Sequence, residues 1–222
     1  MRKHRGQMSE SKAMAVLLTL AGGFQDAYSY NCRGRVFANA QTGNIVLLGQ
    51  NIAEGNWSVA ARYVVPLASF FLGVYLASRI HVHCREGRRF HWRQLVLMAE
   101  MVLLIAAGFL PQSLNMEANA MMSFACAMQV AGFRSFNGLP SATTMCIGNM
   151  RSAAELLCSY HVTGEKEERR KSIHYFAVIL IFAVGAAVGA LSAIRLGERA
   201  IWIAAALLCA GFVLMFVKEE KI

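Results

Sequence analysis

Long apolar segments dominate this chain of 222 residues, and they constrain its fold more than any other feature of the sequence. A helix needs about 20 largely apolar residues to cross a bilayer. Six segments meet or approach that length: Ala13–Asn31, Tyr63–Ile80, Gln94–Leu110, Ala118–Phe133, His174–Ile194 and Ala200–Val217. Because these runs are long and lack the alternation of barrel strands, we predict an all-α integral membrane protein.

The composition supports the same class. The chain is 56% hydrophobic and 16% charged, whereas soluble domains average about 45–50% and about 25%. This balance excludes a disordered or collagen-like chain. Six cysteines occur without a CxxC pair, which argues against a zinc ribbon or a disulfide framework. The net charge of +9 lies between the apolar runs rather than on one basic face, so we expect no nucleic-acid partner.

Two further segments, Val36–Ala53 and Ser135–Tyr160, are partly apolar and are broken near their starts by Gly, Asn and Thr. With six spans and both termini inside, 17 of the 22 Lys and Arg residues lie on the inner side and 5 on the outer side. If both segments crossed, the division would be 11 against 10. Cytoplasmic loops collect Lys and Arg. We therefore predict six transmembrane helices and two re-entrant half-helices, with both termini cytoplasmic.

The chain also contains a weak internal repeat. A Gly-Phe pair, a polar break, a Gly-Asn pair and an apolar helix occur at Gly23-Phe24 and Gly43-Asn44, and again at Gly132-Phe133 and Gly148-Asn149. We predict one membrane domain over residues 1–222, with repeats at about 12–110 and about 117–217. Three spans per repeat would make the second repeat inverted, and inverted repeats hold solutes near the bilayer midplane. The alternative is that Gly-Asn marks only a kinked helix.

Three stretches carry a resemblance to a known family. Residues Gly23–Ala27, Val36–Asn44 and Ala142–Ser152 resemble the signature stretches of the YoaK family, and the form around Ala127–Arg134 is similar to its Gram-positive branch. Ile147 departs from the pattern, where the family more often has Thr. The resemblance covers nearly the whole chain and implies a multi-pass protein of the bacterial cytoplasmic (inner) membrane. It implies no activity.

Charged residues within the spans are the first candidates for function. Asp26 lies six residues from the end of the first predicted span and Glu100 seven residues into the third. Acids inside a membrane are costly and usually face a cavity or a partner. Arg134, Arg151 and Glu155 surround the second broken segment. Arg151 and Glu155 have the spacing of a surface pair on one helix; alternatively, Arg134 or Arg151 neutralises Asp26.

Polar residues at the starts of the half-helices are the second set of candidates. They are Thr42, Gly43, Asn44, Thr143, Thr144, Gly148 and Asn149, and Gln25 and Gln129 lie nearby in the spans. Thr and Asn side chains can simply cap the first turn of a helix. Alternatively, the free N–H groups and the positive end of the helix dipole face a polar or anionic solute.

The sequence contains no recognised catalytic motif and no nucleotide-binding loop. We therefore predict that the chain is not an enzyme and uses neither a cofactor nor a metal. The loop with His81, His83, Cys84 and His91 is interpreted as a solvated basic loop, because five Arg residues share it.

These patterns predict a small secondary transporter of a polar or anionic solute, in which Asp26 and possibly Glu100 couple protons. Two alternatives remain open at this stage. One is a passive channel, and the other is a membrane protein without transport activity, either an assembly partner or a membrane-embedded enzyme. Its expected partners are the lipid bilayer and the solute. Gly73, Gly185 and Gly189 allow close helix contacts, within one chain or in a homodimer.

Overall fold

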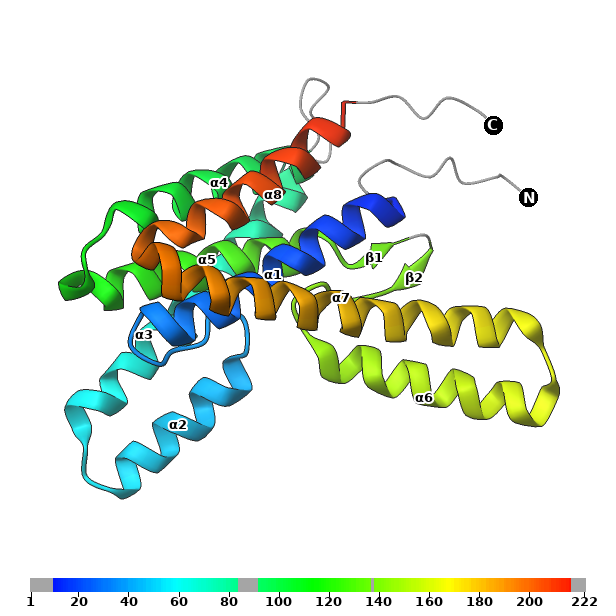
Figure 1. Cartoon of the computed structure of the whole chain (residues 1–222), viewed down its shortest axis with the longest axis horizontal. Coiled ribbons are helices and arrows are strands. Elements are labelled where there is room, and N and C mark those ends of the chain that lie inside the picture. The colour runs from blue at the N-terminus through cyan, green and yellow to red at the C-terminus, as the bar shows by residue number, and fades with distance from the viewer. Residues whose placement is uncertain (1–9, 84–91, 137, 217–222) are drawn as a thin grey trace.

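The computed structural model describes residues 10–83, 92–136 and 138–216, and almost all of this part of the chain is helical (Figure 1). The long helices are α1 (Lys12–Cys32), α2 (Gln41–Ala53), α3 (Trp57–His83), α4 (Trp92–Phe109), α5 (Asn115–Gly132), α6 (Cys146–Thr163), α7 (Lys166–Leu196) and α8 (Ile201–Leu214). Two short 3-10 turns, η3 (Gln112–Leu114) and η4 (Gly197–Ala200), precede α5 and α8. Strands β1 (Ser135–Phe136) and β2 (Leu139–Pro140) form an antiparallel hairpin, with Ser135 opposite Pro140.

Each predicted span corresponds to a helix, but these helices are not equally suited to a bilayer. Within the described residues, three helical runs are long and apolar enough to cross a membrane: Trp57–Val82, Trp92–Phe109 and Lys166–Leu214. The last run contains α7, η4 and α8. Helices α1 and α5 are not among them. Both are largely buried and carry polar side chains such as Asp26 and Gln129 on their inner faces, which lowers their hydropathy.

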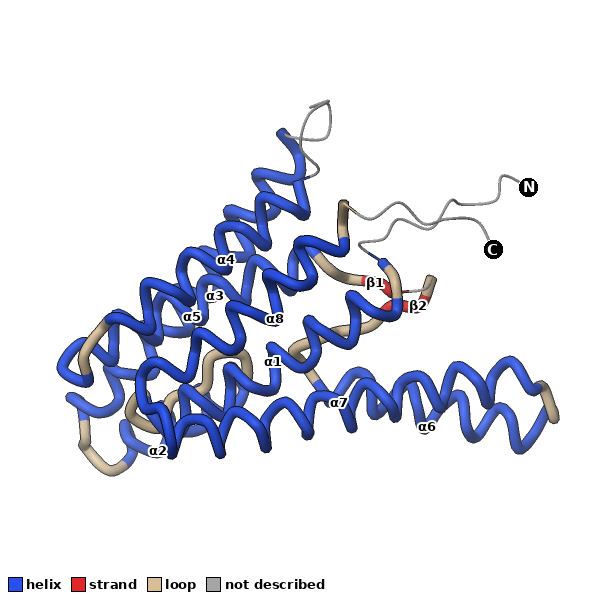
Figure 2. Tube along the Cα trace, turned by 45° about the horizontal axis from the view of Figure 1, so that its top comes forward, coloured by secondary structure: helices blue, strands red, loops and turns tan. Residues whose placement is uncertain are grey.

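Helices α1 and α5 form the centre of the molecule, and each packs along a longer helix. Helix α1 contacts α7 and α8, whereas α5 contacts α3 and α4, and α4 also contacts α8 (Figure 2). The core contains Leu18 and Phe24 of α1, Leu104 of α4, Met122 of α5 and Leu208 of α8.

Glycines let these central helices approach closely. A Cβ atom on Gly189 of α7 would lie 2.5 Å from the carbonyl oxygen of Phe24, and one on Gly185 would collide with the carbonyl of Leu20. A Cβ atom on Gly73 of α3 would lie 2.6 Å from the carbonyl oxygen of Phe124 in α5. Small residues are commonly used in this way between membrane helices. Because the contacts advance together along both chains, α1 and α7 run parallel.

Helices α2 and α6 each begin near the buried centre and run outward beside the helix that follows them, α3 and α7 respectively (Figure 1). Their outer faces are exposed and mainly apolar, as at Ile45 and Val46 in α2 and at Ile147 in α6. Non-helical segments, residues 33–40 and 133–145, lead into them. The hairpin β1–β2 interrupts the second of these segments and was not expected from the sequence.

One asparagine in each of these helices forms hydrogen bonds with the non-helical segment that precedes it. Asn44 accepts a hydrogen bond from the backbone N–H of Phe37 (3.0 Å) and donates one to its carbonyl (2.8 Å). Asn149 makes the same pair of bonds with Ala142, at 3.4 and 2.7 Å. Buried backbone groups outside regular structure need such partners. The Gly-Asn pairs therefore fix a break in the chain rather than a simple kink.

Candidate functional site

The carboxyl group of Glu100 in α4 lies in the interior of the molecule, and the residue is 0% exposed. The side-chain amide of Gln25 in α1 donates to its Oε1 atom at 3.3 Å. The thiol of Cys126 in α5 in turn donates to the Gln25 amide oxygen at 2.8 Å. Three helices thus supply one hydrogen-bonded chain that ends on a carboxyl group.

Gln129 of α5 extends this chain toward the second broken segment. One orientation of its amide satisfies both neighbours: the nitrogen donates to Glu100, 2.8 Å from Oε1, and the oxygen accepts from the hydroxyl of Thr143 at 2.9 Å. Thr143 precedes α6 by three residues and is buried. Glu100 is therefore held between two amides, and the second amide connects it to the tip of the second segment.

Asp26 of α1 holds the tip of the first broken segment in a different way. Its Oδ1 atom accepts hydrogen bonds from the backbone N–H groups of Asn39 (2.6 Å) and Ala40 (3.3 Å), directly before α2. The side chain is 6% exposed. No Lys, Arg or His in the described chain forms an ion pair with Asp26 or Glu100. Backbone and amide donors therefore take the place that a cation would otherwise fill.

Both tips meet at Gly22 in the middle of α1. The Asn39 side chain donates to the Gly22 carbonyl at 2.9 Å, while a Cβ atom on Gly22 would lie 2.9 Å from the carbonyl oxygen of Thr143. Only glycine leaves room here for the backbone of the second segment. The two segments, more than a hundred residues apart in sequence, therefore converge on one turn of one helix.

Two buried oxygen atoms in this region lack a hydrogen-bond partner within the described residues: Asn39 Oδ1 and Thr144 Oγ1. Leaving a buried polar group unpaired costs about 1–3 kcal/mol. These oxygens are therefore suited to hydrogen bonds with a bound polar molecule. We call the residues that converge here the central polar cluster: Gln25, Asp26, Asn39, Glu100, Cys126, Gln129, Thr143 and Thr144.

The structure separates the predicted site residues into two groups. Gln25, Asp26, Glu100, Gln129, Thr143 and Thr144 belong to the central polar cluster. The other residues at the half-helix starts lie outside it. Thr42 and Gly148 are exposed, and Gly43 packs against the ring of Phe37.

Thr and Asn side chains do not cap the half-helices, which was one of the two interpretations that the sequence left open. The residues at the cap positions are Ala40 for α2 and Met145 for α6, and neither makes a side-chain cap bond. Asn44 and Asn149 instead lie inside the first turn, where they bind the preceding non-helical segment. Backbone groups of that segment lie close to the two side-chain amides, so the amides bind them rather than the N–H groups of the helix.

The alternative in which Arg134 or Arg151 neutralises Asp26 is not seen in the structure. Arg151 lies 3.7 Å from Glu155 on the outer face of α6, and its side chain is 78% exposed. Arg134 donates from Nε to the carbonyl of Ala131 at 3.1 Å. Asp26 needs neither residue because backbone N–H groups already bind its carboxylate. The simpler reading of Arg151 and Glu155, a pair four residues apart on one helix, was correct.

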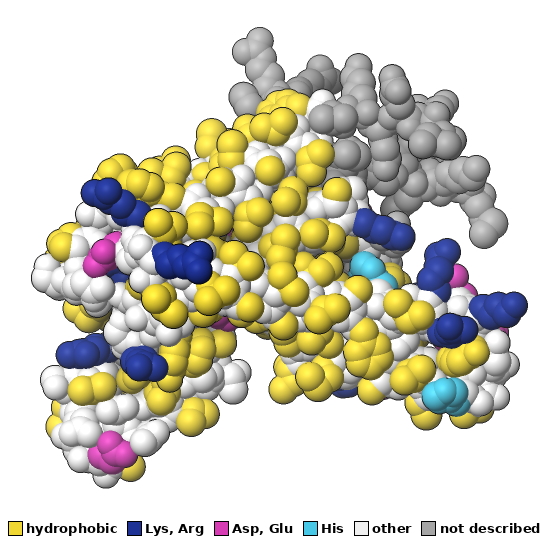
Figure 3. All heavy atoms as spheres, in the orientation of Figure 1, with side chains coloured by type: hydrophobic (Ala, Val, Ile, Leu, Met, Phe, Trp, Pro, Cys, Tyr) yellow, Lys and Arg dark blue, Asp and Glu magenta, His cyan; other side chains and the backbone are white. Residues whose placement is uncertain are grey.

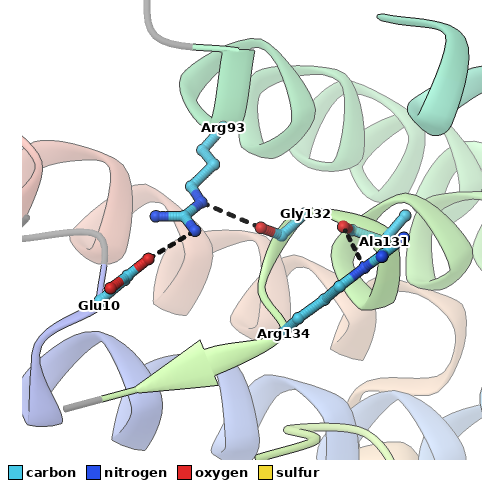
Figure 4. Close-up of polar contacts among 5 residues, drawn as sticks. All are labelled: Glu10, Arg93, Ala131, Gly132 and Arg134. Atoms are coloured by element: carbon cyan, nitrogen blue, oxygen red, sulfur yellow. Dashed lines mark hydrogen bonds and ion pairs between the residues drawn. The ribbon is translucent and has the colours of Figure 1, made fainter. Parts of the chain in front are cut away.

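Arginines at the bundle's two ends bind helix carbonyls instead. Arg33, which the sequence places in an outer loop, is fully buried and donates to the carbonyls of Ala107 (2.7 Å) and Leu110 (2.9 Å) at the end of α4. Arg93 donates to the carbonyl of Gly132 at 3.0 Å and forms an ion pair with Glu10 at 2.7 Å (Figure 4). A cation at the carboxyl end of a helix also offsets its dipole.

Sequence reasoning missed Asn39 and Cys126 as members of the cluster. Asn39 lies within a stretch that carries the family resemblance, but nothing local distinguishes it from its neighbours. Cys126 lies in an apolar run, where Cys commonly behaves as a small hydrophobic residue. Only the meeting of α1, α4 and α5 reveals its role, so no sequence signal could have identified it.

Two grooves lie on different parts of the surface, and one of them is lined by residues of the cluster. One, of about 460 Å³, is lined by Arg134 and Arg151 at its rim and by Thr143 and Thr144. The other, of about 410 Å³, lies beside Arg33, Arg62 and Asn119. The amide of Asn119 donates to the carbonyl of Arg33, while its buried oxygen has no partner within the described residues. The two grooves therefore differ in their lining, although both end at buried polar atoms.

A metal site does not emerge from the described part of the chain, which brings together no group of three His, Cys, Asp or Glu residues that could hold an ion. The ring of His81 lies against that of Trp92 in a tilted arrangement, with ring centroids 4.5 Å apart. Cys84 and His91 lie outside the described residues.

Comparison with known proteins places the chain in a family without a known activity. A family described as "Protein of unknown function (DUF1275)" matches residues 14–214, nearly the whole chain. No curated protein and no solved structure gives a significant match. The match extends over both broken segments and the whole central polar cluster. The chain therefore belongs to the DUF1275 family.

Proposed function

We propose that the chain crosses the bacterial cytoplasmic membrane six times as two inverted repeats, each with one re-entrant half-helix, and that it is a YoaK protein of the Gram-positive branch. This arrangement requires α1 and α7, the first and fifth spans, to run in the same direction, and likewise α3 and α5, the second and fourth spans. The glycine contacts give that direction for α1 and α7. The matching bonds of Asn44 and Asn149 support the repeat.

Labelling of engineered cysteines tests the topology. Glu86→Cys and Lys166→Cys are expected to react with a membrane-impermeant thiol reagent only from the cytoplasmic face. Asn56→Cys and Glu198→Cys are expected to react only from the opposite face. Labelling of the unmodified chain gives the background from its native cysteines. If positions 86 and 166 label from opposite faces, the six-span arrangement is wrong.

We further propose that the protein is a secondary transporter whose solute binds at the central polar cluster. The observation that carries this proposal is the convergence of both broken segments on Gly22, beside two buried acids that have no cationic partner within the described residues. Irregular backbone at membrane depth is tolerated only where protein or a polar cavity satisfies it. Solute sites at half-helix tips are typical of inverted-repeat transporters.

The chemistry of the cluster favours a small polar solute that donates hydrogen bonds. Within the described residues Asn39 Oδ1 is an unpartnered acceptor, and the Thr144 hydroxyl can accept or donate. An acid inside a membrane protein, with no cation beside it, can exchange a proton when its surroundings open to water. Asp26 fits this role best, because its carboxylate binds two backbone N–H groups at the tip of the first segment.

Transport by purified protein in liposomes tests the proposal. Vesicles with a trapped pH-sensitive dye are offered amino acids, dicarboxylates, sugars and nucleosides in turn. At least one solute class is expected to move protons saturably, and Asp26→Asn is expected to abolish that signal. Glu117→Gln is the matched control, since Glu117 is an exposed acid in the first turn of α5. Flux without saturation or proton movement would instead identify a channel.

Access to the cluster provides a test that needs no known solute. Alternating access requires the tips to open to each face in turn. Thr144→Cys, at the floor of the groove beside Arg134, is therefore expected to react with impermeant thiol reagents from both faces, at different rates. A cysteine that is inert from both faces would contradict transport and favour an assembly role.

A further inference from the structure

A third groove, of about 520 Å³, is not explained by the proposed transport role. It lies between the first halves of α1 and α7, beside Gly138 and Leu139 of the hairpin loop. We call it the α1–α7 groove. Figure 3 shows Lys and Arg side chains gathered near the end of the molecule where α6 and α7 join. The groove opens at this basic end.

The part of the groove beside the starts of α1 and α7 is cationic. Lys12 of α1 and Arg170 and Lys171 of α7 line it, together with one acid, Glu167. Glu167 pairs with Arg170 at 3.2 Å. Within the described residues, neither Lys12 nor Lys171 forms an ion pair. Two ammonium groups from different helices therefore face the same groove without a neutralising carboxylate.

The part of the groove farther along both helices is apolar. It is lined by Val16 of α1 and by Ala177, Val178 and Ile181 of α7, one to three helical turns after the cations of the same helix. Helix α7 changes at this level from the charged sequence Lys166–Lys171 to a continuous apolar stretch. Such a change marks the boundary between headgroups and hydrocarbon in a membrane helix. The groove therefore crosses the depth at which a phospholipid changes from headgroup to acyl chain.

Two buried polar atoms also belong to this groove. Thr19 is 1% exposed, and its hydroxyl has no partner within the described residues. The Nε2 atom of His174 is also buried without a partner there. Both residues line the groove. A hydroxyl and an imidazole nitrogen can bind the phosphate or ester oxygens of a lipid. They are independent of the two lysines, and they point to the same ligand.

The groove beside Arg33 lacks this combination. Arg33 uses its guanidinium nitrogens on the carbonyls of Ala107 and Leu110 and on Asn115 Oδ1, at 2.7–3.1 Å. Its charge is therefore bound within the protein and is not offered to an anion. Arg62 is the second cation of that groove and forms no ion pair within the described residues. The α1–α7 groove differs in having two such cations, Lys12 and Lys171, from different helices.

We propose that the α1–α7 groove binds one anionic phospholipid, with the phosphate between Lys12 and Lys171 and an acyl chain along Val16, Val178 and Ile181. Basic pockets between membrane helices commonly bind acidic lipid headgroups. The proposal requires the chain to lie in a bilayer, but it does not depend on the chain transporting a solute.

Native mass spectrometry of the full chain in detergent tests the site. Dioleoylphosphatidylglycerol is expected to remain bound under conditions that remove dioleoylphosphatidylcholine. The double variant Lys12→Gln with Lys171→Gln is expected to bind the anionic lipid about thirtyfold more weakly, since each surface cation contributes about fivefold. Lys166→Gln removes a charge from the first turn of α7 outside the groove and is expected to bind like the unmodified chain.

A second variant keeps the experiment decisive if the double variant fails to fold. Ala177→Phe fills the apolar part of the groove and leaves every cation in place, so it is also expected to lose the lipid. Equal retention of both lipids, or full binding by either folded variant, would overturn the proposal. Displacement of the lipid by millimolar inorganic phosphate would show that the phosphate group alone is recognised, and would overturn the assignment to a phospholipid.

Discussion

The two broken segments reach the same turn of α1 but are held there by different chemistry. The first segment binds an acid, because backbone N–H groups at residues 39 and 40 donate to Asp26. The second segment binds a neutral amide through the contact of Thr143 with Gln129. A proton on Asp26 would weaken the hold on the first tip and leave the hold on the second unchanged. The difference identifies the first segment as the one whose position can respond to protonation.

The largest expected effect comes from the helix pairs that carry the two segments. Gly185→Ala and Gly73→Ala each force a methyl group against a backbone carbonyl of the neighbouring helix. We expect each change to destabilise the protein by about 3 kcal/mol, because backbone cannot give way as a flexible side chain can. Denaturation in detergent micelles measures the loss. Gly49→Ala is the control, since a Cβ there meets nothing within 4 Å. Equal stability of all three variants would contradict the close packing.

The next effect separates the two tips directly. Asp26→Ala removes the acceptor of two buried N–H groups and is expected to cost about 2–3 kcal/mol, whereas Thr143→Val removes one neutral hydrogen bond and is expected to cost about 1 kcal/mol. The same denaturation assay compares them. Ser29→Ala is a useful reference, since its hydroxyl binds Ala38 N–H at 3.0 Å on the same segment without a charge. A larger loss for Thr143→Val than for Asp26→Ala would invert the proposed difference.

The asparagines of α2 and α6 are expected to show where the two segments behave alike. Asn44→Ala and Asn149→Ala each remove the partner of one backbone N–H and one carbonyl in the preceding non-helical segment. We expect each change to lower the free energy of unfolding by about 2 kcal/mol. The Asn149 variant is expected to lose slightly less, because its bond to Ala142 N–H is longer, at 3.4 Å. Asn51→Ala, near the exposed end of α2, is the control. Proteolysis of residues 33–40 and 133–145 would detect local release that denaturation overlooks.

How far the sequence predicted this arrangement depended on the range of the interactions involved. Long apolar runs fixed the helices, because helix formation and burial act within each run. Isolated acids in those runs identified Asp26 and Glu100, since a charge there needs a partner. The partners were not predictable. Arg33 binds carbonyls more than seventy residues away, and Asn39 is distinguished only by the turn of α1 on which it lands.

The smallest expected effect concerns the arginines around the second segment. Arg151→Gln removes only a solvent-exposed pair and is expected to change stability by less than about 0.5 kcal/mol. Arg93→Gln breaks the bonds to Gly132 and Glu10 at the end of α5, where the Arg93 side chain is only 12% exposed, and is expected to cost about 1–2 kcal/mol. A loss for Arg151→Gln as large as that for Arg93→Gln would mean that Arg151 leaves Glu155 and binds a buried partner in the membrane. That result would reopen the pairing of Arg151 with Asp26, and with it the view that backbone N–H groups alone satisfy the first acid.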